Sequence, residues 1–283
     1  SGDGGIATNA KLGYENQNLR VAVDANGDVY IADVANHRIR KITVSNGTIS
    51  TVAGDGVARF AGDGGNATLA SLNRPSNIAF DSVGDMFVLD SGNNRVRKVD
   101  VSTGIITTVA GPAGLSDPRG IAVAPNDAVF VTDTHGSQDL KKIDASGTDN
   151  LITLVNIGGQ PHDIAIDASG TIYVTKTGSS TILKIGGYLT TSVLISGVLG
   201  GRGLNYGADG YLYVAENGGH RVRKIDPANG SSEFIAGWGA GVDSTVGYAG
   251  FTGDGGRATS AQLNRPTGVA ADKWGNYHYS FDT

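Results

Sequence analysis

Side chains suited to binding a small anion recur at one phase of a repeated sequence unit. Each unit begins with a short apolar strand, and the residues at the start of that strand differ from unit to unit. These positions hold the cations Arg119, His162 and Arg202, with the polar residues Asn77 and Asp163 beside them. Three such cations meeting at one point would bind a carboxylate or phosphate. The alternative is that each side chain hydrogen-bonds its own loop and binds nothing.

Histidines suited to zinc are too scattered along the sequence. A catalytic zinc site takes about three protein ligands, and His162 is the one histidine at the positions named above. His37 and His220 stand at one phase of two turns, which predicts a structural role, while His135 and His278 each stand alone. Zinc is therefore not expected as a cofactor.

Oxygen-bearing side chains leave calcium open. Glu216, Asn77, Asn205 and Asp163 are of the type that ligates calcium, but they stand at different phases of the unit. Acids that end one strand of each unit recur with the repeat, and we expect them to accept hydrogen bonds from the backbone of the following turn. These acids are Asp33, Asp90, Asp133 and Glu216. Their repetition favours structure over catalysis, and we expect no resident cofactor.

The repeated unit that positions these residues is clearest from Ile78 to Val99. It has six starts, each with two apolar runs, and in the first five a third run follows that alternates charged and apolar residues. Gly, Asn and Asp separate the runs, which predicts antiparallel hairpins. In the first unit we expect strands at Arg20–Val23, Val29–Ala32, Arg38–Thr43 and Thr48–Ala53. The alternating third strand is expected to turn its Lys and Arg side chains to solvent.

Four strands that grade from apolar to half-polar are typical of a propeller blade. The sequence predicts a single all-β domain, a six-bladed β-propeller of four-stranded antiparallel blades, with strands one and two alone in the sixth. The expected blades are 1–54, 55–111, 112–157, 158–198, 199–237 and 238–283.

The signature residues of the unit resemble the NHL repeats, a family named for an Asn-His-Leu motif. Asn36-His37-Arg38-Ile39 comes close to that motif, and Asn93-Asn94-Arg95-Val96 and Gly219-His220-Arg221-Val222 are variants of it. The resemblance implies a six-bladed β-propeller. Pro161-His162-Asp163-Ile164-Ala165 is similar to the zinc-ligand motif of an amidating lyase with such a propeller, and related lactonases hold calcium in the channel.

Two departures from the repeat are the most distinctive surfaces. Gly-Asp-Gly-Gly opens three similar insertions, around Asp3, Asp63 and Asp254, and a short helical turn is expected from Ala67 to Leu72. Each copy has one acid, which favours a glycine-enabled turn over a phosphate or calcium loop. The last unit stops after its second strand. Its edge, with Tyr277, Tyr279 and Phe281, is expected to pair with strands from beyond Thr283 or from a neighbouring molecule.

Composition excludes several classes of function. The net charge of −5 argues against a nucleic-acid partner, and no run approaches the roughly 18 apolar residues of a membrane helix. No signal peptide is visible, and the chain is expected to be part of a longer one. The absence of cysteine excludes thiolate catalysis and disulfides, and Gly-x-Ser-x-Gly does not occur. Sequons at Asn46, Asn66 and Asn229 are possible glycosylation sites.

The sequence favours a non-enzymatic, extracellular or cell-surface propeller that binds a protein partner or further copies of itself. The alternative is a metal-dependent lyase, or a lactonase or other hydrolase, that acts on a small anionic ligand in the central channel. Arg119, His162 and Arg202 would bind that ligand.

Overall fold

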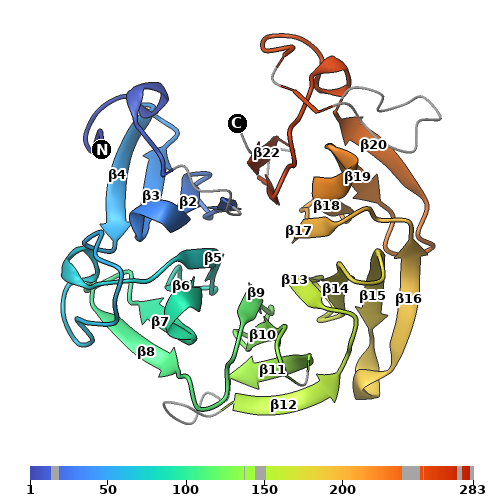
Figure 1. Ribbon diagram of the computed structural model, residues 1–283, viewed down its shortest axis with the longest axis horizontal. Coiled ribbons are helices and arrows are strands. Elements are labelled where there is room, and N and C mark those ends of the chain that lie inside the picture. Colours follow the sequence, from blue (N-terminus) through green and yellow to red (C-terminus); the bar gives the residue numbers. More distant parts are fainter. Residues whose placement is uncertain are drawn as a thin grey trace. The chain divides into compact units, whose positions relative to one another are not determined.

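The computed structural model describes residues 1–13, 19–136, 138–143, 151–237, 249–250, 252–272 and 276–280 (Figure 1). The chain divides into two compact units, Ser1–Asn156 and Ile157–Thr283, and each is described by itself. The prediction of a single domain stays a prediction. Among the described residues, no helix is long and apolar enough to cross a membrane.

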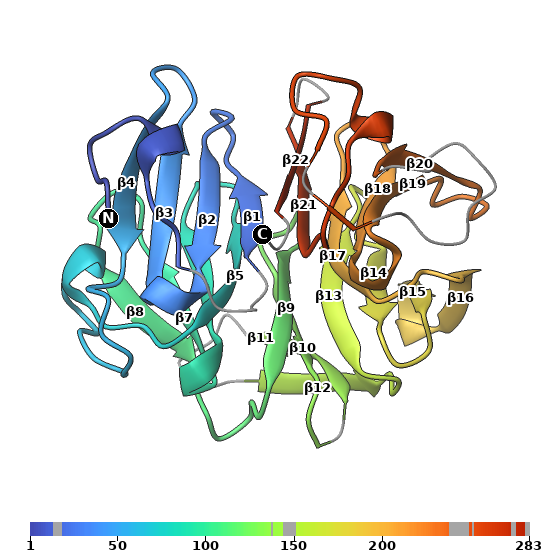
Figure 2. The same cartoon turned by 45° about the horizontal axis from the view of Figure 1, so that its top comes forward.

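The first unit contains three four-stranded antiparallel sheets, each with its strands in chain order (Figure 2). Blade one consists of β1 (Arg20–Val23), β2 (Val29–Asp33), β3 (Arg38–Thr43) and β4 (Thr48–Ala53). Blade two consists of β5 (Pro75–Phe80), β6 (Met86–Asp90), β7 (Arg95–Val99) and β8 (Ile106–Ala110). Blade three consists of β9 (Pro118–Val123), β10 (Val129–Asp133), β11 (Asp139–Ile143) and β12 (Leu151–Asn156). The four strands expected in the first unit of the repeat are confirmed, the second one residue longer.

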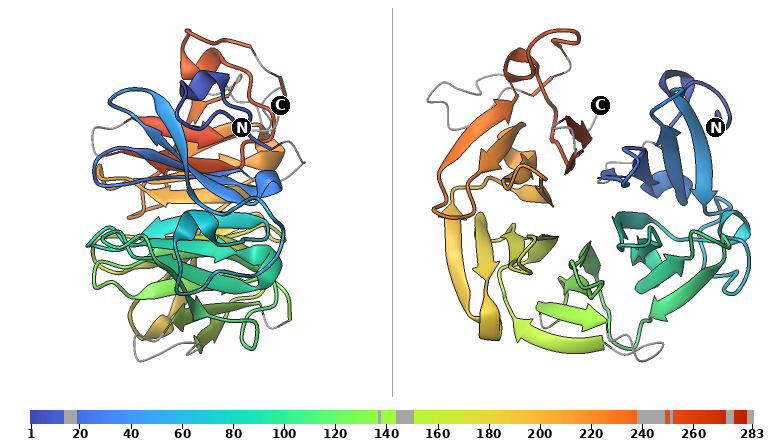
Figure 3. Two further views of the ribbon diagram at one scale, coloured as in Figure 1. Left: turned by 90° about the vertical axis from the view of Figure 1, so that its left-hand side faces the viewer. Right: turned by 180° about the vertical axis from the view of Figure 1, so that it is seen from behind.

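The second unit contains two four-stranded blades and a two-stranded sheet (Figure 3). Blade four consists of β13 (Pro161–Ile166), β14 (Ile172–Lys176), β15 (Thr181–Ile185) and β16 (Thr191–Ser196). Blade five consists of β17 (Gly201–Tyr206), β18 (Leu212–Glu216), β19 (Arg221–Ile225) and β20 (Ser232–Ala236). The two-stranded sheet consists of β21 (Gly268–Ala271) and β22 (Tyr277–Ser280).

The number of blades corrects the expectation from the sequence. The all-β propeller architecture of four-stranded antiparallel blades is confirmed, but the described residues form five such blades, where the repeat predicted six with the last incomplete. The sixth start of the repeat forms only the separate sheet β21–β22 within the described residues. A repeat count records how often a strand pair begins, whereas a blade also needs the outer strands that complete its sheet.

An aspartate after the first strand shapes the tight turn to the second strand in blades one, two and four. In blade one, Asp24 Oδ1 accepts the N–H groups of Asn26 and Asp28 at 2.9 and 3.0 Å. Gly27 has φ +88°, a conformation that favours glycine. In the last sheet, Asp272 Oδ1 accepts Asn276 N–H at 2.8 Å over the same sequence distance. The strands β21 and β22 are therefore built like the first two strands of a blade.

Short 3-10 turns mark the insertions and the connections between second and third strands, and one of them, η5, joins the third and fourth strands of blade four. They are η1 (Ala7–Asn9), η2 (Val34–Asn36), η3 (Ala67–Leu69), η4 (Ser91–Asn93), η5 (Gly187–Leu189), η6 (Asn217–Gly219) and η7 (Ala258–Ser260). The helical turn expected from Ala67 to Leu72 is confirmed but ends at Leu69. Asn66 begins it, because its side chain accepts Thr68 N–H at 2.9 Å.

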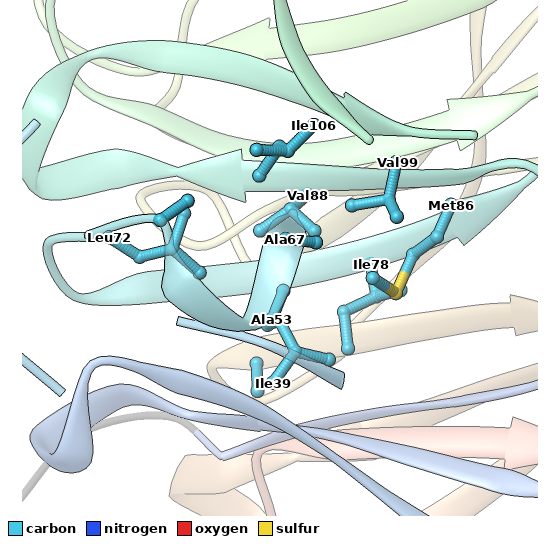
Figure 4. Close-up of a cluster of buried hydrophobic side chains, with 11 residues drawn as sticks. Ile39, Ala53, Ala67, Leu72, Ile78, Met86, Val88, Val99 and Ile106 are labelled. Atoms are coloured by element: carbon cyan, nitrogen blue, oxygen red, sulfur yellow. The ribbon is translucent and has the colours of Figure 1, made fainter. Parts of the chain in front are cut away.

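Apolar side chains of neighbouring blades form the core within each unit. Figure 4 shows the cluster shared by blades one and two, which includes Ile39, Ile78 and Val88. Ala67 and Leu72 of the second insertion pack into the same cluster. A fully buried aliphatic side chain contributes about 1.5–3 kcal/mol, so this insertion helps to hold the two blades together.

The third strands depart from the solvent-facing pattern that their sequence predicts. Arg40 of β3 is 1% exposed and Arg97 of β7 is 0% exposed. Both lie among carboxylates, so the expectation of a solvated face is wrong at these two positions. Lys41 of β3 is partly exposed and pairs with Asp28 at 2.7 Å.

Candidate functional site

The first-strand position of blade three places Arg119 against its own loop. Its Nε and Nη2 donate to Asp117 Oδ1 and Oδ2 at 2.9 and 3.0 Å. The same carboxylate also contacts His135, whose Nδ1 lies 2.8 Å from Asp117 Oδ2. The His135 side chain is 75% exposed. Asp117 therefore joins the Arg119 guanidinium and the exposed His135 imidazole, two groups for which the sequence predicted no connection.

The matching positions of the second unit join neighbouring first strands. His162 is 7% exposed, and its Nδ1 lies 3.2 Å from the carbonyl oxygen of Arg202. Asp163 is 4% exposed, and its Oδ2 accepts Leu204 N–H at 2.7 Å. These side chains stabilise the contact between β13 and β17. Each of them has a framework partner, and a common anion site formed with Arg119 stays a prediction.

The amide side chains predicted for calcium or anion binding also have framework partners. Asn77 Oδ1 accepts Ile78 N–H at 2.8 Å, and its Nδ2 lies 3.5 Å from the carbonyl oxygen of Arg119. Asn205 Oδ1 accepts Ala271 N–H at 3.1 Å. Within the residues that the structure describes, no three His, Cys, Asp or Glu side chains are grouped so that they could hold a metal ion.

The acids that end the second strands have the structural role that their repetition indicated, with different backbone partners. Asp33 accepts Gly13 N–H at 2.7 Å and Asn36 Nδ2 at 2.8 Å. Asp90 accepts Asn73 N–H at 2.7 Å and Asn93 Nδ2 at 2.7 Å. The backbone donor thus comes from the loop before the blade, and the following turn contributes a side chain. Burial raises the pKa of Asp90 to about 6, although these donors and the nearby arginines lower it.

Two signature histidines have the structural role predicted for them. His37 Nδ1 accepts Arg74 N–H at 3.0 Å, and His220 Nδ1 accepts Arg265 N–H at 3.2 Å. Both histidines have positive φ values, 54° and 53°. Each one ties the turn before a third strand to the end of the next insertion. Isolated His278 has its Nε2 4.0 Å from Asp272 Oδ2.

Buried arginines clamped by two acids are the feature that sequence reasoning missed. Arg97 Nη2 donates to Asp63 Oδ1 at 2.6 Å, and its Nη1 lies 3.6 Å from Asp90 Oδ2. Arg40 lies in the same way between Asp3 at 2.6 Å and Asp33 at 3.6 Å. The signal was present in the sequence, because both blades that carry Gly-Asp-Gly-Gly combine an acid at the end of the second strand with Arg-x-Arg in the third.

The predicted assembly edge lies on β22. Tyr277 is 36% exposed, and its ring lies 4.6 Å from that of Tyr213, whose hydroxyl is 2.9 Å from the Tyr277 hydroxyl. Tyr279 packs against the core between blade five and β21. Phe281 lies outside the described residues. Pairing of this edge with another chain stays a prediction.

The three sequon asparagines lie on exposed turns. Asn46 and Asn66 accept the hydroxyls of Thr48 and Thr68 at 2.7 and 2.8 Å. Asn229 accepts Ser231 N–H at 2.7 Å. All three positions are exposed, and their glycosylation stays a prediction.

Comparison with known proteins agrees with the repeat. The teneurin NHL domain profile matches residues 56–117, and the NHL repeat profile matches residues 19–42. Protein SUPPRESSOR OF QUENCHING 1, chloroplastic, from Arabidopsis thaliana is 25% identical over 261 residues, which cover 86% of this chain and 22% of the relative. Teneurin-4 from Mus musculus is 26% identical over 266 residues, 86% of this chain and 9% of the relative. The chain therefore spans a minor part of these relatives.

A solved structure shows the same fold. The gluconolactonase XC5397 from Xanthomonas campestris matches with a TM-score of 0.68 and 16% identity, over 95% of this chain and 85% of that one. Likeness at this identity concerns the fold and carries no activity across. The repeat signature, the four-stranded blades and the two profile matches agree in identifying NHL repeats in this chain.

Proposed function

We propose that this propeller is a protein-interaction or assembly module. The observation that carries the proposal is that the side chains predicted to bind a ligand in the channel are bonded to other parts of the fold. Arg119 binds Asp117, the His162 ring lies against a backbone carbonyl, and Asp163 accepts a backbone N–H. Buried polar groups satisfied in this way hold strands in place.

The sheet β21–β22 supports the assembly proposal. It has the turn and register of the first two strands of a blade, because Val269 lies opposite Tyr279 as Val21 lies opposite Ile31. We propose that it is the inner half of a sixth blade. Its outer strands would come from polypeptide beyond Thr283 or from a neighbouring molecule, and an exposed strand edge recruits such strands through its backbone groups.

An extracellular or cell-surface location is part of this proposal. It is supported by the exposed positions of Asn46, Asn66 and Asn229. Expression of the chain in the secretory pathway of eukaryotic cells should give a product whose mass falls after endoglycosidase treatment. A product of unmodified mass would contradict the proposed use of these sequons.

The experiment that tests the module combines two measurements on the purified chain. Sedimentation velocity across a range of concentrations should show association with itself or with an added partner. Calorimetric titration with inorganic phosphate and acetate should show no saturable binding, either in the natural chain or in the His162→Asn variant. A chain that stays monomeric and binds either anion through His162 would overturn the proposal.

A lyase or lactonase is the second candidate, favoured by the Asp117–His135 pair. An exposed imidazole held by a carboxylate is an arrangement that general bases use. Hydrolysis of gluconolactone, measured with and without added calcium, tests this candidate. Loss of activity in His135→Asn alone would assign the base to His135, and loss in His162→Asn would assign the reaction to the first-strand positions.

A further inference from the structure

The three Gly-Asp-Gly-Gly insertions share one internal structure. The last glycine of each motif donates its N–H to the carbonyl of the first, Gly5 to Gly2 at 3.1 Å, Gly65 to Gly62 at 3.1 Å and Gly256 to Gly253 at 2.9 Å. The second glycine, at the third position of the motif, has positive φ in every copy, 80° at Gly4, 79° at Gly64 and 77° at Gly255. The third copy therefore has the same turn as the other two.

In the second insertion, this turn pairs with the outer strand of its own blade. Gly64 N–H donates to Ile106 O at 2.8 Å, and Ile106 N–H donates to Gly65 O at 2.9 Å. Ala67 N–H donates to Gly104 O at 2.9 Å. The first insertion makes the same three bonds with blade one, from Gly4 to Ile49, from Ile49 to Gly5 and from Ala7 to Gly47. The motif is thus a receptor for the edge of a fourth strand.

The aspartate of the motif binds the third strand of the same blade. Asp3 accepts Arg40 Nη2 at 2.6 Å and the Thr51 hydroxyl at 2.8 Å. Asp63 accepts Arg97 Nη2 at 2.6 Å. The first and second insertions therefore each contact a complete outer hairpin, through the carboxylate on one strand and the backbone on the other.

The third insertion has the receptor without the hairpin. In the part of the chain that the structure describes, the N–H groups of Gly255 and Ala258 and the Asp254 carboxylate have no hydrogen-bond partner. Ala258 is exposed, whereas Ala67 at the same position is 2% exposed. The insertion is nevertheless anchored, because Ala258 O accepts Gly237 N–H at 3.1 Å.

The charge of the same carboxylate acts on a side chain of β22. Burial and the charge of Asp254 raise the pKa of the Tyr279 phenol. In blade two the residue at the Tyr279 position is Val88, which faces Arg97 across the sheet. An arginine placed opposite Tyr279 on an added third strand would therefore point toward Asp254.

We propose that β22 and the third insertion form a docking site for a β-hairpin of a partner polypeptide. The first strand of that hairpin carries an arginine that lies opposite Tyr279 and binds Asp254. A glycine and an isoleucine follow this arginine by seven and nine residues, as Gly104 and Ile106 follow Arg97. The site rests on the proposed function and adds the chemical identity of the docked segment.

The test uses the purified chain and a hairpin taken from its own blade two. The probe is a fluorescent peptide with the sequence of residues 95–110, closed by a disulfide between added terminal cysteines so that the hairpin is preformed. We expect saturable binding by fluorescence anisotropy, and slower amide exchange at Gly255, Gly256 and β22. Asp254→Asn should weaken binding about five- to tenfold, as for a charge-assisted hydrogen bond at a partly exposed position.

Matched controls separate this site from general affinity for peptides. Asp3→Asn alters a copy of the motif that is already occupied, and it should leave peptide affinity unchanged. The same peptide with Arg97→Gln should bind the natural chain as weakly as the natural peptide binds the Asp254→Asn chain. Combining the two changes should lower the affinity no further. Absence of binding by the closed hairpin, or equal affinity of the Asp254→Asn chain, overturns the docking site.

The proposed function and the docking site fail separately. Association of the chain with a partner that Asp254→Asn does not change would retain the module and overturn the docking site. Self-association that Asp254→Asn abolishes, without binding of the hairpin, would place a second copy of the chain there and overturn the proposed occupant.

Discussion

Blades two and five use the same buried arginine position with different carboxylates. In blade two Arg97 lies between Asp90 of its own sheet and Asp63 of the insertion. In blade five the longer Glu216 contacts both Arg221, at 3.0 Å, and Arg223, and no Gly-Asp-Gly-Gly motif is present. The longer glutamate contacts two arginines of its own sheet. The shorter aspartate leaves one guanidinium N–H of Arg97 to be bound by an acid from outside the sheet, Asp63. The insertion thus completes the charge balance of its blade.

Arg97→Met should have the largest effect, because it leaves Asp90 buried and Asp63 without its partner. Removing one member of a buried ion pair costs about 3–5 kcal/mol of unfolding free energy. Arg223→Met should cost less, about 1.5–3 kcal/mol, because Arg221 still contacts Glu216. Urea unfolding of the two variants measures the difference. Equal losses would contradict the dependence of blade two on its second acid.

Aromatic rings over the arginines are common to both blades and should give the next largest effect. The Phe60 ring centroid lies 3.8 Å from Arg95 Cζ, and that of Phe234 lies 3.7 Å from Arg221 Cζ. Leucine keeps most of the apolar contact but removes the π face. Phe60→Leu and Phe234→Leu should each cost about 1 kcal/mol. The double variant Phe234→Leu/Arg221→Met should lose less unfolding free energy than the sum of the two single losses. A loss equal to that sum would show that the ring and the cation are not coupled.

The fold was largely readable from the sequence because its signals are local. Alternating strands and turn dipeptides predicted blade one nearly residue by residue. The blade count was not readable in this way, since a completed sheet depends on strands that a repeat start does not contain. The buried arginines were misjudged for a related reason. Alternation along β7 reports two faces of a strand, but only tertiary structure shows that Asp63 covers one of them.

The candidate site shows the same limit. Sequence phase identified Arg119, His162 and Arg202 as equivalent positions, and the structure places them at corresponding points of their first strands. It could not show that Asp117 would bind Arg119 and His135 together, because these loop contacts vary from blade to blade. Half of the docking surface was predictable, since the sequence shows the first two strands of the sixth repeat, but the role of Asp254 became visible only by comparison with the occupied copies around Asp3 and Asp63.

His220 should make blade five sensitive to mild acid, whereas blade two has Asn94 at the same positive-φ position. Burial, with the nearby Arg265 charge, lowers the pKa of His220. Its neutral Nδ1 accepts Arg265 N–H. A lowered folded-state pKa means that this stabilisation is present above the unfolded value of 6.5 and is lost as pH falls below it. The urea midpoint should therefore fall less between pH 7.5 and 5.5 in His220→Asn than in the natural chain, and an unchanged slope would contradict this.

The hairpin turns between third and fourth strands should give the smallest difference. Asp100 Oδ1 in blade two accepts the N–H and hydroxyl of both Ser102 and Thr103. Asp226 in blade five accepts one backbone N–H, from Ala228, and a side-chain N–H of Asn229. The Ser102 and Thr103 bonds lower the pKa of Asp100 to about 2 from 3.8.

Because the folded-state pKa is lowered, the contribution of Asp100 is present above pH 3.8 and is lost as pH falls toward 2. NMR titration of the Asp100 carboxyl carbon should show this low midpoint. Asp100→Asn keeps an acceptor oxygen but removes the charge, so the acid-induced loss of stability over this range should become shallower. A carboxyl midpoint near 4 would show that four donors on one oxygen do not hold the charged form in this exposed turn.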